Sequence, residues 1–232
     1  MSRPIFSFLL PARGRIHWLK DSISSIFKTA ADVSNVEVLL GMDNDDVDTI
    51  DGIKEFCMEA GYSSVRLCLF ERLGYQNLHL YMNSLAEDAQ GDYLITWNDD
   101  ATLETVGWDQ ILRSAIENQS KLNVYQFQNN HCANIFSAFP KKWYSVLGHI
   151  SLSAPYDSWL SEVSNALDVS VQINIRAFHY RGVKGNEQMP EYNITDYTKA
   201  CLIGHRHYYS DEMLKLRQKD IFTLGNALYA DD

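Results

Sequence analysis

The fold is decided by one stretch of the sequence, Gly91-Asp92-Tyr93-Leu94-Ile95-Thr96-Trp97-Asn98-Asp99-Asp100-Ala101. Its first half is a nearly continuous run of aromatic and branched apolar residues, which is typical of a short strand buried on both faces of a parallel sheet. The run stops at two adjacent carboxylates, Asp99 and Asp100. Ligands of open α/β sheets bind beyond the carboxyl ends of the strands. The stretch therefore predicts a buried strand that leads into a binding site.

Two carboxylates at one strand end suit a hard divalent cation, because such cations take oxygen ligands and commonly bridge phosphates. A solvated turn is the alternative, since Asp and Asn are frequent in turns for local hydrogen-bonding reasons. The rest of the chain favours the first interpretation.

The residues before this stretch alternate between apolar runs and helical spacing of apolar residues. Each apolar run is followed by a polar cluster, and each helical segment leads to the next run. This alternation is typical of a parallel sheet with helices packed on it, joined by right-handed crossovers. Strands are expected at 5–10, 36–42 and 65–70, and helices at 16–26, 49–60 and 78–89.

The pattern becomes mixed beyond Asp100. The polar, glycine-containing segment 182–192 predicts a mobile loop. No shift of composition marks a linker, so we predict one domain spanning residues 1–232, with functional halves at 1–101 and 102–232. Strands are expected at 122–127, 134–139 and 171–178, and helices at 106–118, after Pro140, from near Asp157 and at 211–228.

The composition, 46% apolar and 22% charged, is ordinary for a soluble globular protein. A formal charge of −10 disfavours nucleic acid as a partner, because Lys and Arg contacts to phosphates dominate that affinity. No segment has the apolar length needed to span a bilayer, and the apolar run 6–10 is too short for a signal peptide. The cysteines form no CxxC pair, so we expect reduced thiols and a cytoplasmic protein; they are Cys57, Cys68, Cys132 and Cys201.

The motifs at the strand ends resemble those of GT-A-fold glycosyltransferases, especially the large inverting group called family two. The resemblance covers about residues 5–180 and is strongest at 72–101. Members of that family have a Pro and then an Arg after the first strand, an acidic cluster after the second, and a spaced Gly, Asn, Ala and Gly before the acidic strand end. The matching residues are Leu10-Pro11-Ala12-Arg13-Gly14-Arg15, Asp43-Asn44-Asp45-Asp46, Gly74, Asn83, Ala89 and Gly91.

The resemblance implies a GT-A fold with a mostly parallel central sheet, a mixed acceptor-side half and a helical C-terminal tail. It also implies a nucleotide-diphosphate sugar as donor and a Mn²⁺ or Mg²⁺ ion. Asp100 is expected to bind the metal, and His179 is the candidate second ligand, with a structural role as its alternative. The residues implied to bind the donor are Pro11, Ala12, Arg13, Asp43, Arg72, Tyr75, Asn83 and Asp99.

Three of these roles have ordinary alternatives. Asp43 would accept hydrogen bonds from the base or ribose, but one residue of an acidic cluster commonly caps the next helix. Arg13 and Arg72 could pair with the diphosphate through the guanidinium fork, or could be surface ion-pair residues.

The chain departs from the family pattern at three points. Asn98 stands where the fuller Asp-x-Asp motif has its first Asp, which leaves open which carboxylate holds the metal. Met82 stands where an Arg often precedes the helix Asn. The Gln-x-x-Arg-Trp motif of processive synthases is absent from the sequence, which argues against synthesis of long polymers.

The acceptor side is expected to supply the general base. Asp157, in Pro155-Tyr156-Asp157-Ser158-Trp159-Leu160, stands where the family has an acidic residue at a helix start that deprotonates the acceptor hydroxyl. An Asp at that position is also an ordinary N-cap. Glu162 is the reserve candidate.

The sequence thus predicts a metal-dependent, inverting glycosyltransferase with Asp157 as base. The acceptor is expected to be soluble and its class is open: a glycan, a protein, a small molecule or, disfavoured by charge, a nucleic acid. A sugar-nucleotide pyrophosphorylase is one alternative, although residues 11–15 lack the glycine density of that class. A relative that binds a nucleotide sugar without turnover is the other, and Asn98 and Met82 are the features that support it.

Overall fold

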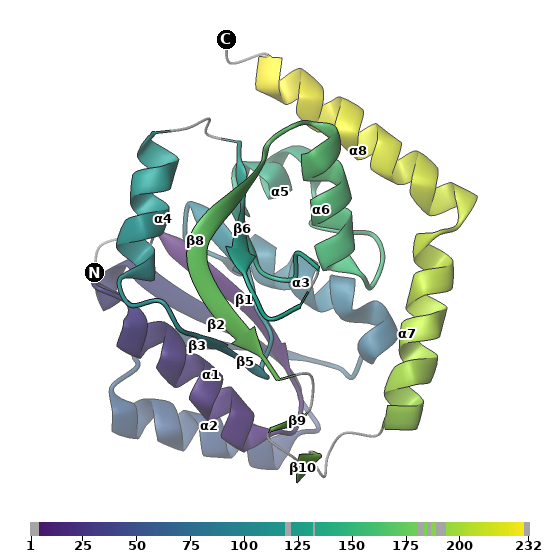
Figure 1. Ribbon diagram of the computed structural model, residues 1–232. Coiled ribbons are helices and arrows are strands. Elements are labelled where there is room, and N and C mark those ends of the chain that lie inside the picture. The colour runs from purple at the N-terminus through teal and green to yellow at the C-terminus, as the bar shows by residue number, and fades with distance from the viewer. Residues whose placement is uncertain are drawn as a thin grey trace.

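The structure, a computed structural model, describes residues 5–118, 122–131, 133–180, 183–184, 187–188 and 194–229. Its centre is an eight-stranded sheet with the order β3-β2-β1-β4-β7-β6-β8-β5 (Figure 1). The strands are β1 Phe6–Ala12, β2 Val36–Asp43, β3 Val65–Phe70, β4 Tyr93–Thr96, β5 Ala101–Leu103, β6 Val124–Gln128, β7 Ser137–Pro140 and β8 Ser170–His179. The helices are α1 Ile16–Thr29, α2 Val47–Ala60, α3 Leu78–Asp88, α4 Trp108–Glu117, α5 Lys142–Leu147, α6 Tyr156–Ala166, α7 Ile194–Tyr208 and α8 Asp211–Tyr229, with short 3-10 helices at Val33–Asn35 and Tyr75–Asn77.

The sheet is parallel in its first half and mixed in its second. Strands β3, β2, β1 and β4 pair in parallel. Strand β7 pairs antiparallel with both β4 and β6, β8 pairs parallel with β6, and β5 pairs antiparallel with β8. The predicted fold class, an α/β sheet with a mixed second half and a helical tail, is confirmed. The assignment of donor and acceptor functions to the two halves stays a prediction.

The two faces of the sheet are covered by two separate hydrophobic cores. Alternate residues of each central strand point to opposite faces, so Phe8 and Leu10 enter one core and Leu9 enters the other. Helices α1, α2 and α4 cover the first face. Helices α3, α5, α6 and α8 cover the second. Burial on both faces explains why the central strands are almost continuously apolar.

The amino end of β4 is fixed by a buried carboxylate on β2, which is separated from β4 by β1. Glu37 Oε1 accepts hydrogen bonds from Ser7 Oγ at 2.6 Å, Gln90 N at 2.5 Å and Gly91 N at 3.2 Å, and Oε2 lies 3.3 Å from Arg66 Nη1. A Cβ atom at Gly91 would lie 2.4 Å from Ser7 Oγ, so a glycine is needed where the chain enters β4. These contacts set the position of the strand that leads to the turn at Asp99 and Asp100.

The expected strands and helices did not include β5 or α7. The expected strand at 134–139 begins three residues later, at Ser137. Within the expected loop 182–192 the structure describes a short antiparallel pair, β9 Val183–Lys184 and β10 Glu187–Gln188. The remaining residues of that segment lie outside the described part of the chain, and its predicted mobility is not tested.

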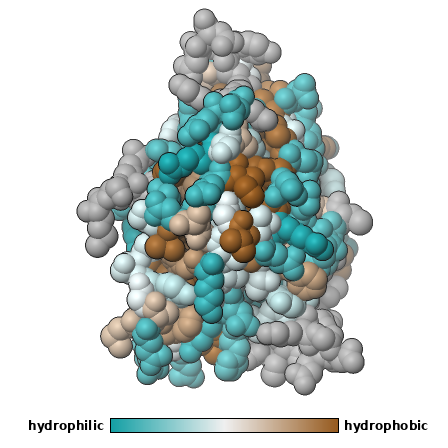
Figure 2. Space-filling model, turned by 60° about the vertical axis from the view of Figure 1, so that its left-hand side comes forward, coloured by the Kyte–Doolittle hydropathy of each residue, from teal (hydrophilic) through white to brown (hydrophobic). Residues whose placement is uncertain are grey.

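The molecular surface in Figure 2 is the face on the left side of Figure 1, and it shows apolar side chains interspersed with hydrophilic ones. None of the helices in the described ranges combines the length and the apolar character that crossing a bilayer requires. Cytoplasmic location stays a prediction from the sequence.

Candidate active site

The acidic and basic motifs after β1, β2 and β4 meet at one edge of the sheet, because these strands are parallel neighbours. Arg13, just beyond β1, places Nη1 2.8 Å from Asp43 Oδ2 at the end of β2, and its Nη2 donates to Asp45 Oδ2 at 3.1 Å. The exposed Asp45 carboxylate has a lowered pKa because it accepts the bonds from Arg13. Arg13 is therefore ion-paired with Asp43 and Asp45, as the ion-pair alternative expects, and its role in binding the diphosphate stays a prediction.

Asp43 is buried and does not cap a helix. Tyr81 on α3 donates its hydroxyl hydrogen to Asp43 Oδ1, and burial together with that carboxylate raises the pKa of Tyr81 to about 12. The N-cap residue of α2 is Asp46, whose Oδ2 accepts a hydrogen bond from Gly14 N at 2.6 Å. The helix-cap alternative for Asp43 is therefore wrong for this residue.

Asp99 and Asp100 form a tight turn between β4 and β5, and both are buried, with exposed fractions of 2% and 6%. The expected alternative of a turn is therefore present, but its carboxylates are buried and not solvated. Arg15, at the start of α1, forms an ion pair with Asp99 Oδ1, and its Nη1 lies 3.7 Å from Asp100 Oδ2. Arg15 has a positive φ of 54°, a conformation that non-glycine residues rarely adopt and that is common at functional sites.

The Asp99 carboxyl is held in an environment that disfavours its charge. Burial raises its pKa to about 6; the charge of Arg15 opposes this effect and the charge of Asp100 adds to it. Its second oxygen, Oδ2, is buried and has no hydrogen-bond partner among the described residues. A buried carboxylate oxygen without a partner is costly, so this atom is poised to receive a donor or a cation.

His179, the last residue of β8, also lies beside the turn at Asp99 and Asp100, although β8 is not a neighbour of β4 in the sheet. Strand β5 pairs Ala101 with His179 at the end of β8, so the turn at Asp100 and the imidazole become neighbours. His179 Nε2 lies 2.9 Å from Asp100 Oδ1 and 3.2 Å from Asn98 Nδ2, and its Nδ1 is buried without a partner in the described structure. One ring nitrogen therefore faces both a carboxylate and an amide donor.

This donor set fits a divalent cation that is completed by a bound ligand. His179 Nε2 and Asp100 Oδ1 lie at a hydrogen-bond distance of 2.9 Å, and imidazole and carboxylate are both groups that bind divalent cations. Among the described residues no group of three or more His, Cys, Asp and Glu side chains is arranged to hold a metal ion alone. Mg²⁺ commonly uses one or two carboxylates together with substrate phosphates, which is compatible with this arrangement.

Asn98 connects this cluster to the acceptor-side helix α6. Its Oδ1 accepts a hydrogen bond from Tyr156 OH at 2.9 Å, while its Nδ2 faces His179. Asn98, the departure from the Asp-x-Asp pattern, thus contacts both Tyr156 on α6 and His179 at the end of β8.

Asp157 lies in the first turn of α6, directly after Tyr156. The N-cap position belongs to Pro155, so the N-cap alternative for Asp157 is wrong. Its Oδ1 accepts a hydrogen bond from Ser158 N at 2.8 Å, and burial raises its pKa. The side chain lines a hollow of about 290 Å³. Glu162 lines the same hollow but is ion-paired with Arg217 at 2.8 Å, which makes the reserve candidate less available as a base.

The other predicted donor residues lie at the end of β1, after β3 or on α3, and the positive charge of Arg72 contributes to the lowered pKa of Asp45. Pro11 and Ala12 end β1 beside β2. Arg72 and Tyr75 are exposed on the segment after β3. Asn83 on α3 holds the backbone before α6, because its Nδ2 donates to Ser151 O at 2.8 Å and its Oδ1 accepts from Ile150 N at 2.7 Å. Their donor-binding roles stay predictions.

Sequence reasoning did not assign three residues that the structure brings into the site. Arg15 belongs to the motif after the first strand, but the family pattern placed the functional Arg at Arg13. Tyr81 and Tyr156 contact Asp43 and Asn98 from helices, and no local motif marks them.

No family model matches the chain, and no curated protein matches it in sequence. Solved structures match it in fold. Mannosyltransferase PcManGT from Pyrobaculum calidifontis, in complex with GDP-Man and Mn²⁺, has a TM-score of 0.68 at 11% identity, over 97% of this chain and 70% of its own. S. aureus TarS 1-349 has a TM-score of 0.58 at 11% identity, over 89% of this chain and 66% of its own, and was also solved with UDP-GlcNAc. Together with the sheet order and the strand-end cluster, this similarity shows that the chain has the GT-A fold of glycosyltransferases.

Proposed function

We propose that the protein transfers a sugar from a nucleotide-diphosphate donor to an acceptor hydroxyl with the help of a divalent cation, Mn²⁺ or Mg²⁺. The observation that carries the proposal is the buried Asp99 Oδ2 without a partner, beside the pair of Asp100 and His179. This arrangement suits a polar ligand and a cation together. The complexes of PcManGT with GDP-Man and Mn²⁺ and of TarS with UDP-GlcNAc support the same ligand class.

Each residue is assigned a role from its position in the site. Asp43 would accept hydrogen bonds from the base or ribose, and Asp99 would bind the ribose or a water on the cation. Asp100 and His179 would hold the cation, which acts as a Lewis acid toward the developing diphosphate charge. Arg13 and Arg15 place positive charge at the same edge, where they oppose repulsion between the carboxylates and the incoming diphosphate.

Asp157 is the proposed general base, and inversion by single displacement is the expected course. Its raised pKa makes the ionised carboxylate a stronger proton acceptor than an exposed Asp. The hollow beside it gives an acceptor hydroxyl a place to approach. The two alternatives, a pyrophosphorylase and a relative without turnover, are outcomes of the test below.

The test has two stages. A thermal-shift screen of UDP- and GDP-sugars with and without MnCl₂ should give a metal-dependent rise in Tm for one donor class, because a ligand that binds the native state stabilises it. Release of the nucleoside diphosphate with an acceptor then reports turnover, and the anomeric configuration of the product reports inversion. Binding without turnover would identify a non-catalytic relative, and release of pyrophosphate from a nucleoside triphosphate and a sugar phosphate would identify the pyrophosphorylase.

Asp157→Asn tests the base. The amide keeps the shape of the side chain, so Tm and donor binding should be retained while transfer falls by about 10²- to 10⁴-fold. Transfer near the parent rate would remove Asp157 from this role and require another base.

A further inference from the structure

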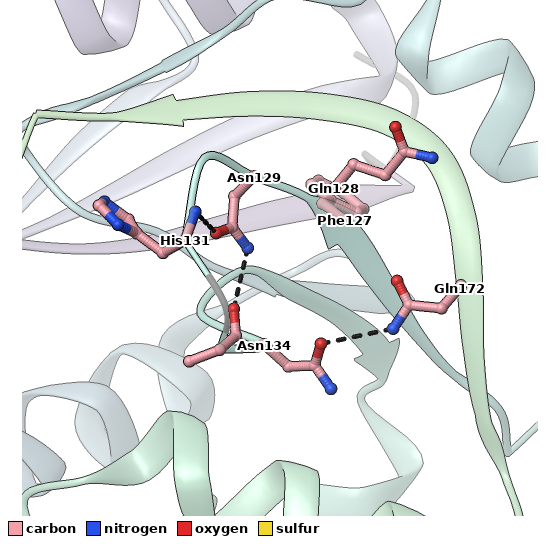
Figure 3. A pocket seen from close by; sticks show the side chains of 7 residues that line it. Phe127, Gln128, Asn129, His131, Asn134 and Gln172 are labelled. Atoms are coloured by element: carbon pink, nitrogen blue, oxygen red, sulfur yellow. Dashed lines mark hydrogen bonds between the residues drawn. The ribbon is translucent and has the colours of Figure 1, made fainter.

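Two hollows lie side by side on the acceptor side of the site and share Ala133 and Asn134. The first, of about 290 Å³, contains Asp157 and is lined by Ala133, Asn134, Asp157, Ser158, Ser161, Glu162 and Tyr209. The second, of about 350 Å³, is shown in Figure 3 and is lined by Phe127, Gln128, Asn129, His131, Ala133, Asn134 and Gln172. We call the two together the acceptor groove. It begins at the proposed base and ends between β6 and β8.

The second hollow presents amide groups with spare hydrogen-bonding capacity. The exposed Gln128 side chain makes no hydrogen bond within the described part of the chain. Gln172 Nε2 donates to Asn134 Oδ1 at 3.4 Å, and Asn134 Nδ2 donates to Ser161 Oγ at 3.3 Å, as Figure 3 shows for the first of these contacts. Both bonds are long and therefore weak. An amide both donates and accepts, which matches the dual character of sugar hydroxyls.

The charges of the groove disfavour an anionic acceptor. Among the residues that line the two hollows there is no Lys or Arg. Asp157 contributes a carboxyl group, and the negative charge of Glu162 is offset by Arg217. A phosphorylated chain or a nucleic acid, whose binding depends on Lys and Arg contacts, would find none of these contacts there.

Tyr209 adds an aromatic surface beside Asp157. The residue is 64% exposed, and its ring packs edge-on against Tyr208 with 5.0 Å between the two ring centroids, so the ring has a packing partner and is still open to solvent. A phenol ring combines an apolar face with a polar tip, which suits packing against the apolar face of a sugar ring. Each hollow alone is near the lower end of the roughly 300–1,000 Å³ range of ligand pockets, so the groove has room for more than one small ring.

We propose that the acceptor is a neutral oligosaccharide of at least two sugar units, bound with one unit against Tyr209 and Asp157 and the next against Gln128, Asn134 and Gln172. This inference rests on the proposed transferase function and names its acceptor class.

The experiment measures binding to the full chain in the presence of the Mn²⁺-nucleotide diphosphate that gives the largest thermal shift. The probes are neutral glucose, mannose, galactose and N-acetylglucosamine oligomers of one to four units. A phosphorylated mannose oligomer and a short single-stranded RNA are tested alongside. Saturation-transfer NMR detects contact, and titration gives the affinity. We expect one neutral series to bind, with affinity rising at least about fivefold from one unit to two through the added contacts.

Gln128→Ala tests the contribution of the second hollow alone, because Gln128 lines that hollow and not the first. Because this side chain makes no hydrogen bond within the described structure, its removal should leave Tm unchanged. We expect it to weaken binding of the disaccharide by about 3- to 10-fold, the value of one or two neutral hydrogen bonds, without affecting the monosaccharide. Gln110→Ala, an exposed glutamine on α4, is the matched control and should change neither affinity.

Three outcomes would overturn the inference: preference for the RNA or the phosphorylated oligomer, affinity independent of oligomer length, or no neutral oligomer bound. The metal-dependent nucleotide shift distinguishes this failure from failure of the proposed function. If the shift is present and no oligosaccharide binds, the acceptor assignment alone is wrong. If the shift itself is absent, the proposed function fails first.

Discussion

Carboxylates are buried at both the amino and the carboxyl ends of the central strands, but the two differ in how completely their oxygens are hydrogen-bonded. At the amino end, Glu37 accepts hydrogen bonds from Ser7, Gln90 and Gly91 and lies beside Arg66. At the carboxyl end, Asp99 is as deeply buried, yet one of its oxygens has no partner within the described structure and a second carboxylate lies next to it.

The difference distinguishes a structural carboxylate from a functional one. A buried acid whose oxygens all have donors stabilises the fold, whereas one that lacks a donor destabilises it until a ligand arrives. The Glu37 end therefore holds β4 in place, and the other end of the same strand presents Asp99 and Asp100 to a ligand. Substitutions at the amino end should therefore change stability, and substitutions at the carboxyl end should change ligand binding and sugar transfer.

The largest expected effect follows from Asp100→Asn. We expect transfer to fall by about 10³-fold and metal-dependent nucleotide binding to weaken, because an amide is a poorer cation ligand and a Lewis acid contributes several kcal/mol. Tm should be unchanged or slightly raised, since one of two adjacent carboxylates is neutralised. Kinetics and calorimetric titration with Mn²⁺ measure both. Asp92→Asn, at the exposed amino end of β4, is the control, and nucleotide binding equal to the parent in Asp100→Asn would place the metal elsewhere.

The next effect is on stability and comes from Glu37→Ala. Loss of this carboxylate leaves buried donors of Ser7, Gln90 and Gly91 unpaired, so the free energy of unfolding should fall by about 3 kcal/mol. For a chain of this size that corresponds to a fall in Tm of about 6 to 12 °C. Urea unfolding and calorimetry measure it, with the exposed Glu55→Ala as control. The folded fraction of Glu37→Ala should still bind the metal and nucleotide. If the variant were as stable as the parent but did not bind them, the structural role of Glu37 would be contradicted.

The parallel half of the fold could be predicted because each of its strands is an apolar run that ends in a polar cluster. Strand β5 could not, since Ala101–Leu103 is three residues long and carries no periodicity. Helix α7 lacked a readable buried face, and two of its apolar residues, Leu202 and Ile203, are more than half exposed. Short or polar elements of this kind depend on tertiary contacts that a single sequence does not display.

The positions of candidate site residues could be predicted where they follow strand ends, as with Asp43, Asp99 and Asp100, and their roles stay predictions. Contacts made across the fold were not readable. Arg15 acts from a left-handed backbone conformation that its residue type does not suggest, and Tyr156 reaches Asn98 from 58 positions away along the chain. A motif identifies residues that are close together in the sequence. The pairs of Arg15 with Asp99 and of Tyr156 with Asn98 depend instead on how the helices pack against the sheet.

A smaller effect should appear in the pH dependence of stability without metal. The folded-state pKa of Asp99, about 6, lies above its ordinary value, so its contribution to stability is full below about pH 4 and is lost as pH rises through 6. The unfolding free energy of the parent minus that of Asp99→Asn should therefore fall by on the order of 2 kcal/mol from pH 4 to 7. Arg15, Asp100 and His179 face this carboxyl and will broaden the transition. A difference that is flat with pH, or that rises, would mean that Asp99 is not destabilised by its burial.

The smallest effect tests whether Asn98 transmits the position of α6 to the metal cluster. Tyr156→Phe removes the donor to Asn98 Oδ1 and frees the amide to rotate away from His179, so affinity for the Mn²⁺-nucleotide should fall about threefold, and stability by about 1 kcal/mol. The control Tyr125→Phe, on β6, removes a hydroxyl that donates to Ala115 O at 3.3 Å and also interacts with Asn123. It should cost similar stability and no nucleotide affinity. If the two variants lose stability alike and neither loses affinity, the link from Tyr156 through Asn98 to His179 is structural packing, and the carboxyl end of the sheet would bind its ligand independently of α6. A loss of nucleotide affinity in Tyr156→Phe alone would instead show that the Asn98 amide couples the position of α6 to the proposed metal ligands.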